Sequence, residues 1–227
     1  MAVPEPAGDG ICLCRGSGDA WPRAALRARP APQRLIRGAI YTIGAALVGC
    51  AALWQATDGA RAITAEGARR VAVADTPRPV PPIVVETMAG ASVVPAEGPA
   101  LVEFIYTTCP TICQVLGGDF AELRDHLAAE DLSVPMFSIS FDPKNDDLEA
   151  MRTYADLHTA TGNPWTIARP HLDDLPALLR TFDVTVIPDN WGGYEHNIAV
   201  LLIDGDARFA GAFDTRAFAE IIHAVRG

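Results

Sequence analysis

The sequence predicts an α/β domain, with a central mixed sheet flanked by helices, that follows a single N-terminal membrane helix. An uncharged apolar run occupies residues 38–56, and strand-like and helix-like segments alternate between residues 101 and 225. Two cysteines, Cys109 and Cys113, directly follow the first buried strand at the start of a helix. Alternation of this kind is typical of a sheet covered by helices.

Charge is distributed unevenly along the chain of 227 residues, which has a formal net charge of −10. Before residue 58, six arginines outnumber three acidic residues, whereas the remainder holds 12 basic and 25 acidic residues. Nucleic-acid binding needs a basic face, so we expect no nucleic-acid partner for this acidic part.

The N-terminal part is interpreted as a targeting region. Residues 1–37, rich in Pro, Ala, Gly and Arg, are predicted to be a disordered cytoplasmic tail. Residues 38–56 match the ~20 apolar residues that span a bilayer. Because Arg34 and Arg37 precede them and basic residues stay in the cytoplasm, the C-terminal domain is predicted to lie in the periplasm, anchored to a bacterial inner membrane.

A second interpretation of the anchor stays open. The tetrapeptide Leu47-Val48-Gly49-Cys50 resembles a bacterial lipobox, and cleavage there would leave Cys50 as a lipidated N-terminus. The apolar run continues beyond Cys50 as far as Trp54, which favours an uncleaved helix. Residues 57–79 are assigned to a linker, and the prolines of 58–98 predict a stiff, partly extended spacer.

Residues 80–227 are predicted to form the folded domain. Apolar and β-branched runs predict strands at 80–87 (a short edge strand), 101–106, 134–140, 165–168, 198–203 and 208–213. Apolar spacings of three and four predict helices at 113–129, 146–159 and 172–182, and Thr215 is expected to cap a last helix that ends at Val225. A cysteine pair after the first buried strand indicates a thioredoxin-like sheet.

The chemistry of the cysteine pair follows from its place at a helix start. Residues four apart share one face of a helix, and the N-terminal end of the dipole favours thiolate over thiol. Three roles remain open for Cys109 and Cys113: a dithiol–disulfide pair, a metal site with a third ligand, or a structural disulfide. Two thiolates and one imidazole suit Cu(I), whereas a closed zinc site needs four ligands.

One of five histidines would supply the third ligand. His126, His158, His171 and His223 lie within or beside predicted helices. His196 differs because it lies in an irregular loop, residues 191–197, that leads into a buried strand. In a thioredoxin-like sheet this loop faces the start of the cysteine helix. His196 is therefore the candidate ligand, with an ordinary loop histidine as the alternative.

Three motifs resemble those of the SCO/SenC family, copper-handling proteins of cytochrome c oxidase assembly. They are Tyr106-Thr-Thr-Cys109-Pro-Thr-Ile-Cys113-Gln114, Ser138-Ile-Ser-Phe-Asp142-Pro143, and Gly193-Tyr-Glu-His196-Asn197 before a strand that ends in Ile203-Asp204-Gly205. The resemblance covers roughly residues 80–227 and includes the strand–helix order. Many family members have an acidic residue where this chain has Thr111.

The resemblance implies a metal site and its partners. In the family, two cysteines and one histidine bind a copper ion as Cu(I) or Cu(II), and they correspond here to Cys109, Cys113 and His196. The aspartate that matches Asp142 lies near the site. The implied partners are cytochrome c oxidase subunit II, a periplasmic copper donor or thiol reductant, and the membrane that holds the anchor.

Two functions therefore compete. In the first, the chain is a copper chaperone for the oxidase copper site. In the second, it is a thiol–disulfide oxidoreductase that keeps the cysteines of that site reduced, with Cys109 attacking and Cys113 resolving. Asn197 stands where redoxins usually have a proline, which favours copper. A peroxide or redox sensor is a third, weaker hypothesis, and whether the chain is an enzyme stays open.

Overall fold

A computed structural model describes residues 33–95, 98–109 and 112–227, without the side chains of Arg34, Ile112 and Cys113. Most of the tail predicted at residues 1–37 therefore lies outside the described residues. The chain divides into two units, residues 1–49 and residues 50–227, each described here by itself.

Helix α1 (Gln33–Ala56) contains the predicted membrane segment. Within it, Leu35–Ala56 has a mean hydropathy of 1.6 and is long and apolar enough to cross a membrane. A helix of 24 residues is about 36 Å long, and the hydrocarbon core of a bilayer is about 30 Å thick. The helix continues through Cys50, which is exposed. The transmembrane anchor and the lipobox both remain predictions.

An eight-stranded mixed sheet forms the centre of the domain, in the order β1-β10-β9-β4-β5-β6-β2-β3. Its middle strands β4, β5 and β6 are parallel, whereas β9 and β2 pair antiparallel on either side of them. The strands are β1 (Arg78–Pro79), β2 (Ile83–Thr87), β3 (Gly90–Val94), β4 (Ala100–Ile105), β5 (Met136–Ser140), β6 (Trp165–Pro170), β9 (Val200–Ile203) and β10 (Arg208–Phe213). The predicted mixed sheet is confirmed.

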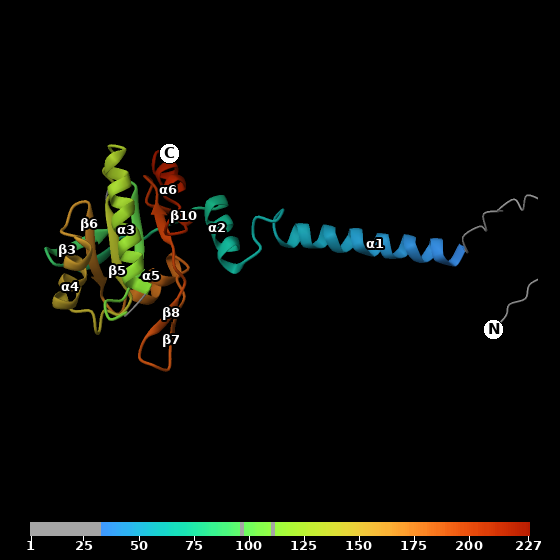
Figure 1. The fold of residues 1–227 in the computed structure, drawn as a ribbon. Coiled ribbons are helices and arrows are strands. Elements are labelled where there is room, and N and C mark those ends of the chain that lie inside the picture. Colours follow the sequence, from blue (N-terminus) through green and yellow to red (C-terminus); the bar gives the residue numbers. More distant parts are fainter. Residues whose placement is uncertain (1–32, 96–97, 110–111) are drawn as a thin grey trace, which may run out of the picture. The chain divides into compact units, whose positions relative to one another are not determined.

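Helices cover both faces of this sheet (Figure 1). They are α3 (Ile112–Ala129), α4 (Leu148–His158), α5 (Leu175–Thr181) and α6 (Phe218–Val225). On one face, Phe120 of α3 packs against Trp165 with 5.4 Å between ring centroids. On the other face, Phe104 of β4 packs at 5.7 Å against Phe182, which follows α5. Successive strand side chains alternate between faces, so β4 is buried from both sides.

The spacer prediction is wrong at residues 65–75, which form helix α2 (Ala65–Asp75). The Thr64 hydroxyl caps this helix by accepting a hydrogen bond from the Gly67 amide at 2.9 Å. Val73 is buried in the domain core, and the Arg69 guanidinium donates to the Phe182 carbonyl at 3.0 Å. The folded domain therefore begins earlier than the prolines of this region indicated.

Two further predictions need correction. The strand expected at the edge is β2, but it lies between β6 and β3, so β3 forms the edge. The last helix begins at Phe218 with Ala217 at its N-cap, not at Thr215. The Thr215 hydroxyl instead donates to the Asp119 carboxylate at 2.7 Å, which joins the segment before α6 to α3.

The irregular loop expected at residues 191–197 contains a strand. Strand β8 (Tyr194–His196) pairs antiparallel with β7 (Val186–Pro188) in a separate two-stranded sheet. His196 stands opposite Val186 in this pairing. Figure 1 shows the hairpin of β7 and β8 extending beyond the sheet and helices of the domain. The hairpin fixes the backbone of His196, which the sequence analysis had left irregular.

Candidate metal centre

The cysteine loop connects the central strand β4 to helix α3. Tyr106 directly follows β4, and the amide of Cys109 donates to the Tyr106 carbonyl at 3.3 Å, which closes a turn. Cys109 is buried. Cys113 lies in the first turn of α3, but its side chain is outside the described part. The predicted strand–loop–helix order is confirmed, and the bonding of the two sulfur atoms stays a prediction.

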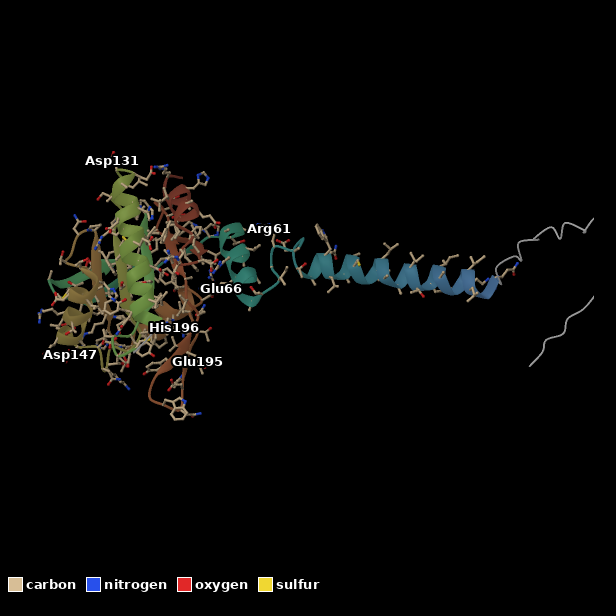
Figure 2. The ribbon with its side chains drawn as sticks, viewed as in Figure 1. Arg61, Glu66, Asp131, Asp147, Glu195 and His196 are labelled. Atoms are coloured by element: carbon tan, nitrogen blue, oxygen red, sulfur yellow. The ribbon has the colours of Figure 1, made fainter. Side chains whose placement is uncertain are left out.

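His196 lies in a cluster of aromatic rings at the same end of the sheet. Its ring centroid is 4.9 Å from that of Phe141, which follows β5, and 6.5 Å from that of Tyr106. Tyr194 packs edge-on against Tyr106 and Phe141 at 5.2 and 5.5 Å. Figure 2 shows His196 and Glu195 where the hairpin meets the body of the domain. The structure therefore brings His196 beside the residue that begins the cysteine loop.

The imidazole of His196 has one nitrogen with a partner and one without. Nδ1 is 3.2 Å from the Asn197 carbonyl oxygen, whereas Nε2 is buried and makes no hydrogen bond to the residues that the structure describes. Burial lowers the pKa of His196, because the charged form loses its hydration. A neutral ring that donates from Nδ1 presents a lone pair at Nε2. Such a ring, oriented by a backbone carbonyl, matches the usual arrangement of a histidine metal ligand.

Asp142 lies beside this aromatic cluster, and its role at a metal site stays a prediction. Its carboxylate is buried and accepts a hydrogen bond from the side-chain amide of Asn145 at 2.8 Å. Burial raises the pKa of Tyr194, and the charge of Asp142 and a hydrogen bond to it raise that pKa further. Asp142 therefore touches the Tyr194 side of the cluster.

Asp146 is a residue of the site that the sequence analysis missed. Its fully buried carboxylate accepts from the Thr107 amide at 3.1 Å to each oxygen, and from the Thr107 hydroxyl at 2.6 Å. The Ser140 hydroxyl at the end of β5 also donates to it, at 2.5 Å. Because Thr107 is two residues before Cys109, Asp146 holds the cysteine loop against the end of the neighbouring strand.

The sequence predicts a helix that begins at Asp146. In the structure, α4 begins at Leu148 and Asp147 is its N-cap, accepting from the Ala150 amide at 2.8 Å. Two adjacent aspartates thus have different roles, and only one of them caps the helix. The signal in the sequence was this surplus acid before a helix that needs a single cap.

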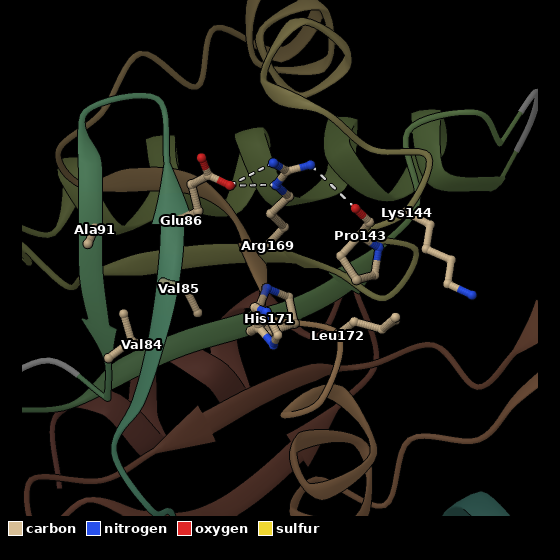
Figure 3. A pocket seen from close by; sticks show the side chains of 10 residues that line it. Val84, Val85, Glu86, Ala91, Pro143, Lys144, Arg169, His171 and Leu172 are labelled. Atoms are coloured by element: carbon tan, nitrogen blue, oxygen red, sulfur yellow. Dashed lines mark hydrogen bonds and ion pairs between the residues drawn. The ribbon is translucent and has the colours of Figure 1, made fainter.

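Arg169 binds the segment that follows β5, which contains Pro143 and Asp146 (Figure 3). The Arg169 guanidinium forms an ion pair with Glu86 at 2.7 Å and donates to the carbonyl oxygens of Asp146 at 3.0 Å and Pro143 at 3.3 Å. Glu86, Arg169 and Pro143 border a pocket of about 380 Å³ between β2 and the end of β6. Hydrogen bonds therefore run from Glu86 through Arg169 and Asp146 to the cysteine loop.

The described residues contain only part of the predicted ligand set. Within them, no group of three His, Cys, Asp or Glu side chains could hold a metal ion, and the Cys113 side chain lies outside that part. His196 and Asp142 meet at one aromatic cluster, which also contains Tyr106 from the cysteine loop. The orphaned Nε2 of His196 fits a metal ligand, and the first turn of α3, which contains Cys113 but not Cys109, favours a thiolate at Cys113.

A protein-family model described as SCO1/SenC matches residues 93–226. The chain belongs to this family. Among curated proteins, the SCO1 protein homolog of Bacillus subtilis (strain 168) is 32% identical over 65 residues, which are 29% of this chain and 34% of the relative. The chain thus matches about a third of the length of that relative.

Solved structures of Sco proteins share the fold. BsSco, described as a member of the Sco family of cytochrome c oxidase assembly proteins, superposes with a TM-score of 0.59 at 21% identity, over 66% of this chain and 92% of that chain. ScoI of Bradyrhizobium japonicum, solved with copper bound, superposes with a TM-score of 0.52 at 22% identity, over 65% and 98% of the two chains. The predicted thioredoxin-like fold of the Sco proteins is confirmed.

Proposed function

We propose that this chain binds a copper ion through the thiolates of Cys109 and Cys113 and Nε2 of His196, and delivers it to the copper site of cytochrome c oxidase subunit II. The observation that carries the proposal is the buried Nε2 atom of His196, which has no hydrogen-bond partner among the described side chains and backbone and lies among rings beside the cysteine loop. An unpaired buried polar atom is costly, and a metal ion would satisfy it.

The surrounding residues support a soft metal ion as cargo. Two thiolates with one imidazole favour Cu(I) over harder cations. Tyr106 and Phe141 keep water from the imidazole, and Asp142 adds a negative charge nearby without being a ligand. Copper-bound relatives, including ScoI of Bradyrhizobium japonicum, have the same fold. A periplasmic copper donor would load the site, and the ligands of subunit II would take the ion by exchange.

A second function uses the same cysteines without metal, and the place of Cys113 in the first turn of α3 favours it. The Cys109 thiolate would attack a disulfide of subunit II and form a mixed disulfide. The Cys113 thiolate would then attack the Cys109 sulfur, leaving an intramolecular disulfide here and a reduced dithiol on the partner. A periplasmic thiol reductant would restore the Cys109–Cys113 dithiol.

The location proposed for this chemistry follows from α1. We place the helix across a bacterial inner membrane, with the N-terminus in the cytoplasm and the domain in the periplasm, because Arg34 and Arg37 precede the apolar stretch. Lipidation at Cys50 is the alternative, and it puts the domain on the same side. The intact mass of the mature protein distinguishes the two.

Copper titration of the full chain in detergent tests the proposed metal site. We expect one Cu(I) per chain in competition with a chromogenic chelator, and a thiolate-to-copper absorption band with Cu(II). His196→Ala should weaken Cu(I) binding by about 10- to 100-fold and change the Cu(II) spectrum, since a ligand is lost. Cys109→Ser combined with Cys113→Ser should abolish both signals.

His171→Ala is the matched control, because His171 is exposed beside the pocket of Figure 3 and makes no contact with the aromatic cluster. Its copper affinity should equal that of the wild type. Copper binding that is unchanged in His196→Ala, together with thiol-dependent reduction of a subunit II disulfide, would refute the copper site and support the oxidoreductase.

A further inference from the structure

The turn at the tip of the β7–β8 hairpin is held by several hydrogen bonds to Asp189. One oxygen of the Asp189 carboxylate accepts from the amides of Trp191 and Gly193, both at 2.7 Å. The Asp189 amide donates to the Gly193 carbonyl at 2.9 Å and closes the turn. At its base, the Tyr194 amide donates to the Tyr106 hydroxyl at 3.4 Å. The turn therefore presents its central residues in a defined geometry.

The residue displayed on this turn is a tryptophan. Trp191 is 93% exposed, whereas Trp165 in the core of the same domain is 1% exposed. Ile187, on β7, is 55% exposed and adds apolar surface to the hairpin. Leaving a large aromatic side chain in water forgoes its burial energy, and tryptophan is the residue type most enriched at the energetic centres of protein interfaces. The hairpin thus presents an anchor with no cover among the described residues.

Charge narrows the kind of partner. The hairpin, residues 186–196, has two acidic residues, Asp189 and Glu195, and no lysine or arginine. Glu195 is exposed on the hairpin itself (Figure 2). An anionic membrane surface attracts basic segments, so it would disfavour this hairpin. A protein pocket that is apolar inside and basic at its rim would suit both the tryptophan and the acidic flank.

We propose that Trp191 is the docking anchor by which this chain engages its protein partner, inserting into an apolar pocket with a basic rim. This inference rests on the proposed function, since the partner is then the one that receives copper or electrons. Trp191 and His196 are five residues apart, a reach of at most about 17 Å along a strand. A partner that grips the tip is thereby held with its acceptor groups close to His196.

The test measures association of the full chain in detergent with the domain of subunit II that contains the copper site, prepared without metal and taken from the same organism. Trp191→Ala should weaken binding by about 10- to 30-fold, the range of an interface hot spot. Its Cu(I) affinity should stay that of the wild type, because Trp191 is almost fully exposed and is not one of the proposed ligands. Glu195→Gln should lessen the dependence of the association rate on salt.

Leu157→Ala is the matched control, because Leu157 of α4 is 61% exposed and offers comparable apolar area elsewhere. It should bind subunit II as the wild type does. Equal affinity of Trp191→Ala and wild type would overturn the inference. Copper binding is measured separately, so a chain that fails to bind copper but still docks through Trp191 would disprove the proposed function alone.

Two other occupants of the tip are distinguished in parallel. In bilayers that contain brominated phosphatidylglycerol, Trp54 of α1 would be quenched in every variant; additional quenching that is lost in Trp191→Ala would place the tip in the membrane and overturn docking to a protein partner. Concentration-dependent self-association that Trp191→Ala abolishes would assign the tip to a second copy of this chain, with the same consequence. We expect neither effect.

Discussion

Two buried carboxyl groups, Asp146 at the end of the sheet and Glu103 at its centre, differ in the number of hydrogen-bond donors that reach them. Asp146 receives hydrogen bonds from the Thr107 amide and from the hydroxyls of Thr107 and Ser140. Glu103, in the middle of β4, is reached among the described residues by the Ser138 hydroxyl alone, at 2.5 Å. The Ser138 oxygen in turn accepts from the Trp165 indole at 2.8 Å.

Burial raises the pKa of both groups, and hydrogen bonds from one donor residue at Glu103 and from two at Asp146 oppose that shift. Burial raises the pKa of Glu103 to about 8, the negative charge of Asp119 adds to the effect, and one hydrogen bond opposes it. Burial also raises the pKa of Asp146, but hydrogen bonds from Ser140 and Thr107 counteract it. Near neutral pH, Glu103 is a neutral acid inside the sheet, whereas Asp146 has donors suited to an anion. The number of donors, more than the depth of burial, separates a packing residue from one that positions the cysteine loop.

The largest effect is expected from Asp146→Ala. The Thr107 amide and two hydroxyls would lose their acceptor in a dry site, so unfolding should become easier by about 3–5 kcal/mol. The cysteine loop would lose its attachment to β5, and Cu(I) affinity should fall about 10-fold or more. Urea unfolding and chelator competition on the chain in detergent measure the two quantities.

Asp147→Ala is the neighbouring control. Asp147 is exposed and only caps α4, so its loss should cost about 1 kcal/mol and leave copper affinity unchanged. If both variants lost the same stability and the same affinity, Asp146 would have no special relation to the cysteine loop.

A smaller, pH-dependent effect is expected from Glu103→Gln. The pKa of Glu103 is higher in the folded chain than the ordinary value of 4.5, so its favourable contribution is present below pH 4.5 and is lost as the pH rises to about 8. Glutamine does not titrate. The stability of the variant relative to wild type should therefore increase by about 2–4 kcal/mol between pH 5 and pH 8. Parallel pH profiles of urea unfolding would show that Glu103 is not protonated in the fold.

The smallest effects should come from the two serines, which form a matched pair. Ser140→Ala leaves the Asp142 amide and the Asp146 carboxyl group short of a partner, and Ser138→Ala does the same for the Trp165 indole and the Glu103 carboxyl group. At pH 7 we expect a loss of about 2 kcal/mol for Ser140→Ala and about 1 kcal/mol for Ser138→Ala. Above pH 8, where Glu103 ionises, the loss for Ser138→Ala should grow. If the stability losses of the two variants differed at pH 9 by the same amount as at pH 7, the proposed ionisation of Glu103 would be contradicted.

The sequence predicted features that depend on local pattern. The strands β4 and β5 are apolar runs, and α3 shows a clear helical spacing, so each was found within a few residues. His196 was singled out because it stands apart from the helices, and the structure places it beside Tyr106. The resemblance to the SCO/SenC family led to the family that the comparison confirms.

Features that depend on distant contacts were missed. Helix α2 packs against β10, and its Arg69 donates to the Phe182 carbonyl; nothing in the composition of the helix indicates either contact. Strands β7 and β8 have three residues each and exist through their mutual pairing. Asp146 acts through Thr107, 39 positions away in the sequence. In each case the partner lies far along the chain, where periodicity carries no information.

The docking of α2 onto the domain determines how far the domain can move from its anchor. Only residues 57–64 separate α1 from α2, and a fully extended segment of that length reaches at most roughly 30 Å. If α1 spans a bilayer as proposed, a linker of this length would keep the domain near the membrane surface, together with any partner held in the same membrane. Confinement of this kind raises the effective concentration of two partners, to the millimolar range for short linkers. Weak intrinsic affinity would then suffice for frequent encounters and would still allow rapid release.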